Sequence, residues 1–245
     1  MLLNITPDHL DRYDSFEAYA ASKARLFEMQ NPSNYGLISE DDEGSLSQFR
    51  SHTHASLFTR DAWRQYLNLV PALPGPHNLE NIAAAYYTCF RLGVSAQMID
   101  AALCTYPGLP HRMERIRDRD GVLFVNDSKA TNAEPAAPAL AAYPKVRWII
   151  GGQAKSDSLG DTAAQLGHVV KANTIGEAGP MFARLLRGAG VAVEECETLE
   201  IAVNRAARDS QPGEVVLLSP ASASFDQFRD FEARGDRFRE LVEGL

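Results

Sequence analysis

Short apolar runs alternate with longer amphipathic stretches over the second half of the chain, from Pro110 to the C-terminus. The runs are rich in β-branched and aromatic residues, as buried strands are. In chain order they read VLFVND, VRWIIGG, HVVKANTIG, VAVEEC and EVVLLSP, with helical stretches between them and at the end. This alternation predicts an α/β fold with a mainly parallel sheet that helices cover on both faces.

The first part of the chain has a more mixed pattern. The expected elements are a strand over LLNIT, a helix over 15–29, strands over 35–59 around turns at 41–45, and a helix over 78–92. Gly93 then suits the C′ position of that last helix. The stretch YPGLP at 106–110 is rich in Pro and Gly, as linkers tend to be, so we expect two domains, 1–109 and 110–245.

The composition of the chain excludes a few broad classes of function but does not identify one. The chain of 245 residues has a net charge of −8, which argues against a general binder of nucleic acid or of anionic membranes. Its three cysteines form no CxxC pair, as in a protein with reduced thiols, and no signal peptide or run of 18 apolar residues is present. We therefore expect a cytoplasmic protein that binds neither nucleic acid nor membrane.

The most informative stretch is GVLFVNDSKATN at 121–132, where an apolar strand runs into a polar turn and then a helix near Glu134. Asp127, Ser128, Lys129 and Thr131 lie in the turn. Open α/β sheets present ligand-binding groups at this position, beyond the carboxyl ends of their strands. An ordinary strand-to-helix turn with Asx capping is the alternative interpretation of the turn taken alone.

Two stretches in the first part of the chain could also bind a ligand. The sequence DHLDRY at 8–13 places His9 beside carboxylates after a predicted strand, which could ligate a metal, although a solvated turn is the commoner outcome. Asn78 and Asn81 are three residues apart and so share one helix face, where they could read a base edge. An asparagine at the N-cap or in the first turn of a helix is at least as good an explanation. The pair His52 and His54 lacks a third ligand nearby and favours a solvated edge strand.

Two further turns follow predicted strands in the second part. GGQAKS at 151–156 does not fit a P-loop, because a P-loop needs Gly-x4-Gly-Lys-Ser/Thr, yet Lys155 could still bind a carboxylate or a phosphate. LLSPASASFDQF contains Ser219, Ser222 and Ser224 before a final helix that we expect to open at Asp226. Capping alone could account for these serines.

Seven stretches occur in one order: LNITPDHLDRY, AASKARLFE, GPHNLENIAAA, GLPHRME, VNDSKATN, GGQAKS and LLSPASASFDQFRDFEARGDRF. Together they resemble the D-glutamate-adding Mur ligases of peptidoglycan synthesis. The resemblance covers nearly the whole chain and is weakest over 31–70, which looks like a variable hairpin region. It implies that 1–109 is a partial central ATPase domain and that 110–245 is a complete, Rossmann-like C-terminal domain.

The resemblance also implies an activity. These ligases phosphorylate the carboxylate of UDP-N-acetylmuramoyl-L-alanine with ATP, and the amine of D-glutamate attacks the acyl phosphate. Mg²⁺ would neutralise charge on the phosphoryl group in transfer. The implied partners are therefore these two substrates, with ATP and Mg²⁺ as cofactors, in an enzyme that is monomeric in its full-length form.

Site residues carry over from the resemblance one by one. His9 matches a metal ligand, and Lys23 matches a catalytic lysine that is carbamylated to ligate a second magnesium. The positions that match groups around the nucleotide are Asn78, Asn81, His111, Arg112 and Asp127. The positions that match groups around D-glutamate and the acyl end of the substrate are Lys129, Thr131, Lys155, Ser224 and Phe231.

The sequence departs from the family in one large respect, because it contains no GxxxxGK[ST] and no UDP-binding domain. We therefore expect a C-terminal portion of such a ligase, inactive alone and with a fragile region 1–109, since a sheet without its early strands exposes unpaired edges. A non-catalytic nucleotide- or glutamate-binding module, or another member of the Mur ligase and folylpolyglutamate synthase superfamily, are the alternatives. A Rossmann-type oxidoreductase is disfavoured because no GxGxxG follows any strand.

Overall fold

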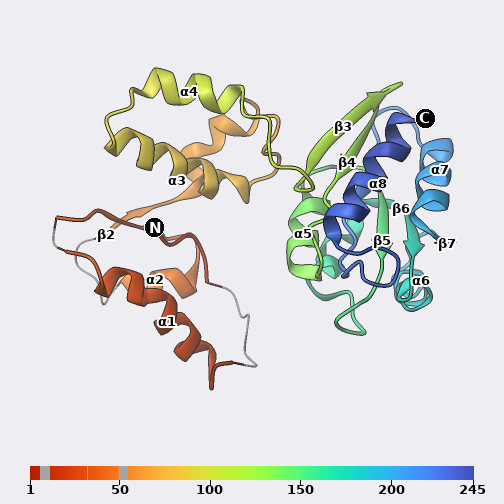
Figure 1. The fold of residues 1–245 in the computed structure, drawn as a ribbon, viewed down its shortest axis with the longest axis horizontal. Coiled ribbons are helices and arrows are strands. Elements are labelled where there is room, and N and C mark those ends of the chain that lie inside the picture. The colour runs from red at the N-terminus through yellow and green to blue at the C-terminus, as the bar shows by residue number, and fades with distance from the viewer. Residues whose placement is uncertain (6–11, 32, 50–54) are drawn as a thin grey trace. The chain divides into compact units, whose positions relative to one another are not determined.

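The computed structural model describes residues 1–5, 12–31, 33–49 and 55–245 (Figure 1). Their contacts divide the chain into two compact units. Unit 1 comprises Met1–Pro71 and Pro76–Tyr106, and unit 2 comprises Ala72–Gly75 and Pro107–Leu245.

Unit 1 is mainly helical and contains a two-stranded parallel sheet. Its elements are α1 (Phe16–Glu28), β1 (Gly36–Ser39), α2 (Glu43–Phe49), β2 (Ala55–Phe58), the 3-10 helix η1 (Arg60–Leu67), α3 (Asn78–Arg91) and α4 (Ala96–Cys104). Ser15 caps α1 by accepting a hydrogen bond from the Ala18 N–H. The expected helices 15–29 and 78–92 are confirmed within a residue at each end, and Gly93 has the left-handed φ of 88° that a C′ residue needs.

The expected strands and turns over 35–59 are partly wrong, and so is the hairpin expected over 31–70. Residues 43–49 form the helix α2, and β1 pairs with β2 in parallel, so that Gly36 lies opposite Ala55 and Ser39 opposite Phe58. Parallel strands cannot be joined by a tight turn, which is why a helix connects them. The expected strand LLNIT is reduced, in its described part, to one isolated bridge from Leu2 to Ile38.

Unit 2 is a three-layer α/β structure. Its elements are β3 (Glu114–Arg119), β4 (Val122–Asn126), α5 (Ala133–Ala141), β5 (Val146–Gly151), η2 (Gly160–His168), β6 (Val169–Ile175), α6 (Gly179–Gly188), β7 (Val193–Glu197), α7 (Leu199–Asp209), β8 (Val215–Leu218) and α8 (Phe231–Glu243). The sheet has the strand order β3-β4-β8-β5-β6-β7, and every pair except β3-β4 is parallel. The predicted mainly parallel sheet is confirmed.

Alternate residues of the central strands build the two cores of unit 2. Trp148 and Leu217 face the core that α5 and α6 cover, whereas Ile149 and Val216 face the core that α7 and α8 cover. Figure 1 shows α7 and α8 together beside the sheet. A two-sided core explains why these strands read as continuous apolar runs.

Two elements of unit 2 differ from the sequence-based expectation. β3 was not expected, because its sequence ERIRDR is mostly charged and suits an exposed antiparallel edge. The final helix begins at Phe231 and not at Asp226, and its cap is Asp230, whose side chain accepts from the Ala233 N–H. The serines of 219–224 are therefore not caps of this helix.

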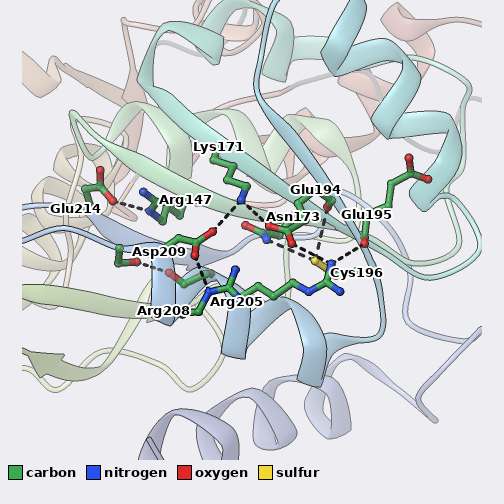
Figure 2. Close-up of polar contacts among 12 residues, drawn as sticks. Arg147, Lys171, Asn173, Glu194, Glu195, Cys196, Arg205, Arg208, Asp209 and Glu214 are labelled. Carbon is green, nitrogen blue, oxygen red and sulfur yellow. Dashed lines mark hydrogen bonds and ion pairs between the residues drawn. The ribbon is translucent and has the colours of Figure 1, made fainter.

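A network of ion pairs lies toward the amino ends of the strands (Figure 2). Lys171 of β6 contacts both Glu194 of β7 and Asp209 at the end of α7, and Arg205 of α7 also pairs with Glu194. These contacts connect the outer strands to α7 at the amino ends of the strands. We call this end of the sheet the amino edge; the predicted polar turns lie at the opposite, carboxyl edge.

Candidate functional site

The polar turns that follow β4, β5 and β8 lie side by side, because β8 stands between β4 and β5 and all three strands are parallel. Backbone hydrogen bonds link the turns directly. The Asp127 N–H donates to the Leu218 carbonyl at 2.7 Å, and Gln153 and Ala223 exchange N–H···O bonds of 2.9 and 3.0 Å. The carboxyl edge of the sheet, where the three parallel strands end, thus gathers turns that are up to 92 residues apart in sequence.

Asp127 is a buried carboxylate at the centre of this edge, with 7% of its surface exposed. Its two oxygens accept hydrogen bonds from the Met113 N–H at 3.1 Å and from the Ser219 hydroxyl at 2.8 Å. Burial raises the pKa of Asp127 to about 7, although these hydrogen bonds and the charge of Arg112 act in the opposite direction. A carboxyl group poised in this way is typical of functional sites.

Lys129 and Phe231 meet although they are about 100 residues apart. The Lys129 ammonium lies 4.0 Å from the centre of the Phe231 ring, a cation–π contact. The His111 ring meets the same phenyl ring edge-on, with 6.0 Å between centroids, and the Lys129 N–H donates to the His111 carbonyl at 3.1 Å. The structure therefore brings together three of the residues that the sequence singled out.

Arg234 of α8 ties the turns to one another and is only 1% exposed. Its guanidinium donates to the Ser128 hydroxyl at 3.0 Å, to the Ser128 carbonyl at 2.9 Å and to the Ala223 carbonyl at 3.3 Å. The Ser128 hydroxyl in turn donates to the Phe231 carbonyl at 2.8 Å. Burial lowers the pKa of Arg234 from its usual value, but a guanidinium stays charged at neutral pH, so a fixed positive charge lies beneath the site.

The turn at 111–113 is strained and closely packed. His111 and Met113 in this turn adopt left-handed φ values of 62° and 47°, and Ala221 in the turn after β8 has a φ of 52°. Such values cost free energy in residues other than glycine. Gly235 makes the approach of α8 possible, because a Cβ there would stand 2.1 Å from His111 Nδ1. The same ring also lies 3.6 Å from an Asp236 carboxylate oxygen. Strain of this kind gathers at sites where the surrounding structure holds it in place.

The remaining predicted residues of unit 2 differ in exposure. Ser224 is 2% exposed, and the Ser222 hydroxyl is buried without a partner among the described residues. Lys155 is exposed and lies two residues beyond Gln153, whose backbone pairs with Ala223 next to Ser224. Backbone carbonyls accept the N–H groups of 151–153, so these do not form a phosphate cradle. Thr131 and Arg112 lie in the two turns that flank Asp127, and Arg112 is exposed.

In unit 1 the structure places three of the predicted site residues. Asn81 Nδ2 donates to Asn78 Oδ1 at 3.1 Å, which confirms that the two side chains share a face of α3, and the N-cap of this helix is His77 and not an asparagine. Lys23 is exposed on α1, with its ammonium 5.3 Å from the centre of the Tyr19 ring. His9, His52 and His54 lie outside the described residues.

The described residues include no group of three or more His, Cys, Asp and Glu side chains that could hold a metal ion. Within the same residues no helix is both long and apolar enough to cross a membrane.

Sequence reasoning missed Arg234 and the role of Ser128. The signal for Arg234 was present, since Arg234, Phe238 and Val242 recur every four residues and all three are buried. A lone arginine on the apolar face of a helix needs hydrogen-bond partners in the core, and here they are the turns of the site.

The fold and the site define a class: an α/β domain of Rossmann-like topology whose polar turns converge at the carboxyl edge of a parallel sheet. Comparison with known families makes this specific. The Mur ligase middle domain matches residues 1–62, and the Mur ligase glutamate ligase domain matches residues 111–222. The chain therefore belongs to the Mur ligase family.

Curated relatives point to the D-glutamate-adding members of that family. The chain is 52% identical over 249 residues to UDP-N-acetylmuramoylalanine–D-glutamate ligase of Novosphingobium aromaticivorans, covering 100% of the chain and 56% of the relative. It is 49% identical over 251 residues to the ligase of the same name from Zymomonas mobilis, with the same two coverages. The chain thus spans 56% of the length of these relatives.

Solved structures share the fold at low sequence identity. UDP-N-acetylmuramate-alanine ligase from Thermotoga maritima has a TM-score of 0.68 at 16% identity, over 99% of this chain and 60% of that one. Bifunctional folylpolyglutamate synthase/dihydrofolate synthase from Yersinia pestis, solved with AMPPNP and a Mn ion, has a TM-score of 0.67 at 20% identity, over 98% of this chain and 60% of that one. These structures support the fold alone.

Proposed function

We propose that the chain is part of an ATP-dependent ligase that adds D-glutamate to UDP-N-acetylmuramoyl-L-alanine through an acyl phosphate, in peptidoglycan synthesis. In this proposal residues 1–109 belong to the central ATPase domain and residues 110–245 form the C-terminal domain. The observation that carries the proposal is the convergence of the turns after β4, β5 and β8, which Arg234 holds together within unit 2.

D-Glutamate carries two carboxylates, and its amine must face the acyl phosphate. We propose that the ammonium groups of Lys129 and Lys155 and the hydroxyls of Thr131 and Ser224 bind these carboxylates. Charge-assisted hydrogen bonds of this type are about twice as strong as neutral ones and fix orientation. Phe231 would limit the position of Lys129, whose ammonium already lies 4.0 Å from its ring centre. Held in this way, the amine would react as if it were intramolecular.

Nucleotide binding is assigned to both units. Asn78 and Asn81, paired on the first turn of α3, have the amide donors and acceptors that read an adenine edge. His111, Arg112 and Asp127 lie in the turns at the carboxyl edge of unit 2, where a guanidinium and a carboxylate suit phosphate and ribose hydroxyls respectively. ATP would supply the phosphoryl group that activates the substrate carboxylate.

Mg²⁺ is assigned to His9 and to Lys23 in its carbamylated form. The described residues alone include no group of three side chains that could hold the ion. An unmodified ammonium would repel the cation, whereas a carbamate supplies oxygen ligands. Lys23 is exposed on α1 and therefore open to carbon dioxide. In a full-length ligase that carries this chain, Lys23→Ala should abolish activity and short carboxylic acids should restore part of it. Failure of rescue in an otherwise folded variant would contradict the assignment.

The test of the proposal uses a chimera in which this chain follows the N-terminal part of the Novosphingobium relative. D-Glutamate-dependent phosphate release is measured with ATP, Mg²⁺ and UDP-N-acetylmuramoyl-L-alanine. Lys155→Ala should raise the KM for D-glutamate roughly ten- to a hundredfold, because one charge-assisted hydrogen bond contributes about 1.5–3 kcal/mol. The KM for ATP should barely change.

The matched control is Lys145→Ala, an exposed lysine just before β5, at the opposite end of the strand from Lys155. Its KM for D-glutamate should stay at the parent value. An active chimera whose KM for D-glutamate is unchanged by Lys155→Ala would contradict the proposed glutamate site. Phosphate release that does not depend on D-glutamate would contradict the proposed activity.

A further inference from the structure

A second concave site lies in unit 2, at the carboxyl ends of the outer strands β6 and β7. The cavity has a volume of about 280 Å³, just below the usual range for pockets that bind drug-sized ligands. Thr174 and Glu195 form neighbouring positions of β6 and β7 in the sheet register, and the start of α6 with Gly179 and Pro180 lies beside them. Its other lining residues are Gly176, Glu177, Glu197, Asp226 and Gln227.

The charge of this cavity is strongly negative. Four of its lining residues are carboxylates, Glu177, Glu195, Glu197 and Asp226, and none is basic. Arg187 of α6 pairs with Glu195 at 2.8 Å, and the buried Arg234 interacts electrostatically with Asp226, so the carboxylates exceed the nearby positive charges by two. Carboxylates placed so closely favour a cation.

Two buried polar atoms of the cavity lining have no hydrogen-bond partner among the described residues. One is the hydroxyl of Thr174, a residue that is 1% exposed, and the other is Asp226 Oδ1. A Cβ on Gly179 would stand 3.7 Å from the Thr174 hydroxyl, an ordinary van der Waals contact. Buried polar atoms are normally paired, and each that is not needs an explanation. A ligand that donates hydrogen bonds to both oxygens supplies one.

The start of a helix often binds an anion, but the start of α6 is closed to one. The Glu177 N–H donates to Asp226 Oδ2 at 2.9 Å, the Ala178 N–H to the Gly152 carbonyl at 2.9 Å, and the Gly179 N–H to the Gly176 carbonyl at 3.0 Å. Pro180 has no N–H at all. Anion binding at a helix start requires free N–H groups, and these four positions offer none.

We propose that this cavity binds a small aliphatic amine in its alkylammonium form, with the ammonium donating to Asp226, Thr174 and Glu197. An ammonium is a compact charge with three donors, which matches a cavity lined by acceptors. A divalent metal fits less well, because the described residues contain no group of three ligands placed to hold one. The proposal does not depend on the proposed ligase activity.

The site is tied to the turn that holds Ser224. A Cβ on Gly176, which has a φ of 68°, would stand 2.2 Å from Asp226 Oδ2, so only glycine lets the two loops approach. Asp226 lies two residues after Ser224 and accepts the Glu177 N–H of the loop between β6 and α6. Binding at Asp226 therefore contacts the same loop that carries a proposed glutamate ligand.

The test is an NMR titration of the ¹⁵N-labelled chain with 1,4-diaminobutane, with Nα-acetyl-lysine N-methylamide and with inorganic phosphate. The two amines distinguish a free diamine from the end of a lysine side chain, and saturable shifts of the Gly176–Gly179 amides with either one are expected. Glu197→Gln should raise the Kd about tenfold, because the ammonium then donates to a neutral acceptor in place of a carboxylate. Thr174→Val should raise it several-fold without any change in charge.

Glu232→Gln is the matched control, since it removes the same charge from an exposed residue outside the cavity. Its Kd should stay within about twofold of the parent, as expected for a screened surface charge. The proposal is overturned if neither amine saturates by about 50 mM, if Glu197→Gln and Glu232→Gln weaken binding equally, or if phosphate binds instead. Glu197 has an exposed side chain, so its variant keeps the test decisive even if Thr174→Val does not fold.

Discussion

The carboxyl and amino edges of the six-stranded sheet of unit 2 differ in whether their charged side chains are paired with groups of opposite charge. At the carboxyl edge, Asp127 accepts only from an amide and a hydroxyl, and the hydrogen bonds of Arg234 go to two carbonyls and a hydroxyl. At the amino edge, Lys171 meets both Glu194 and Asp209, and the buried Arg147 pairs with Glu214 (Figure 2). Charged groups that are not bonded to a group of opposite charge cost stability but remain able to bind a charged ligand.

The same difference appears in the protonation of two aspartates. Burial raises the pKa of Asp127 at the carboxyl edge, whereas hydrogen bonds from Arg208 and Lys171 lower the pKa of Asp209 at the amino edge. One edge of the sheet therefore destabilises an ionised carboxylate and the other stabilises one. We take the carboxyl edge as the binding edge and the amino edge as a source of stability.

Loss of Arg234 should have the largest effect. Arg234→Met keeps much of the volume but removes three hydrogen bonds to the turns. We expect unfolding free energy to fall by about 3–5 kcal/mol, since hydrogen bonds from charged donors contribute about 1.5–3 kcal/mol each and only part is regained by avoiding desolvation. Urea unfolding in a Trp63→Phe background measures this for unit 2 alone, because Trp148 is then the single tryptophan.

Arg229→Met is the control for Arg234, because Arg229 has 85% of its side chain exposed and pairs with the N-cap residue Asp230. Its effect should stay within about 0.5–1 kcal/mol, the usual size for an exposed ion pair. Equal effects at the two positions would mean that Arg234 does not hold the turns together.

The next largest effect is expected in the pH dependence of stability, which should differ between the two edges. The folded pKa of Asp127 is about 7, against an ordinary value of 3.8, so between these pH values the folded state binds more protons than the unfolded state. Stability from this group must therefore fall as pH rises from about 4 to 7 and then level off. Asp127→Asn should remove this loss, of which we expect on the order of 2–3 kcal/mol to fall between pH 5 and pH 8. Its Nδ2 can donate to the Ser219 hydroxyl, which then accepts.

Urea unfolding at pH 5 and pH 8 checks this expectation in the parent and in Asp127→Asn. The parent should lose stability relative to the variant at the higher pH. A parent whose stability relative to the variant does not change over this range would show that Asp127 is already ionised at pH 5 in the folded state, as Asp209 is. For Asp209 the lowered pKa gives the opposite sign, and its contribution is lost only in acid.

The smallest effect is expected at Lys171. Lys171→Met removes two ion pairs, but Glu194 keeps Arg205 and Asp209 keeps Arg208, so no carboxylate loses its last partner. We expect a loss of about 1 kcal/mol or less that shrinks further in high salt, because partly exposed pairs are screened. A loss as large as that of Arg234→Met would remove the distinction between the two edges.

Much of unit 2 could be predicted from the sequence, because strands such as VRWII and VVLL are buried on both faces and so read as apolar runs. The strand β3 could not, because its residues face solvent at an edge and are mostly charged. The helix α2 was also missed. Its sequence EGSLSQF contains Gly44 and two serines, which have weak helix propensity, and the parallel pairing of β1 with β2 is what requires a helix there.

The site could be predicted in its parts but not in its organisation. Resemblance to known ligases marked Lys129 and Phe231, and the structure places them in contact. The local sequence does not reveal that the Ser128 hydroxyl and carbonyl both accept hydrogen bonds from Arg234, which lies 106 residues further on in α8. Such contacts depend on strand order, and a period or a motif does not reveal that β8 lies between β4 and β5.

The central claim is that D-glutamate binds at the carboxyl edge of unit 2, and amide chemical shifts of the chain titrated with D-glutamate test it most directly. We predict saturable shifts confined to 127–132, 152–156 and 222–231, weaker with L-glutamate and lost in Lys155→Ala. Shifts that are absent at saturation, that are equal for both enantiomers, or that fall mainly on the ion-pair network of the amino edge would contradict the claim.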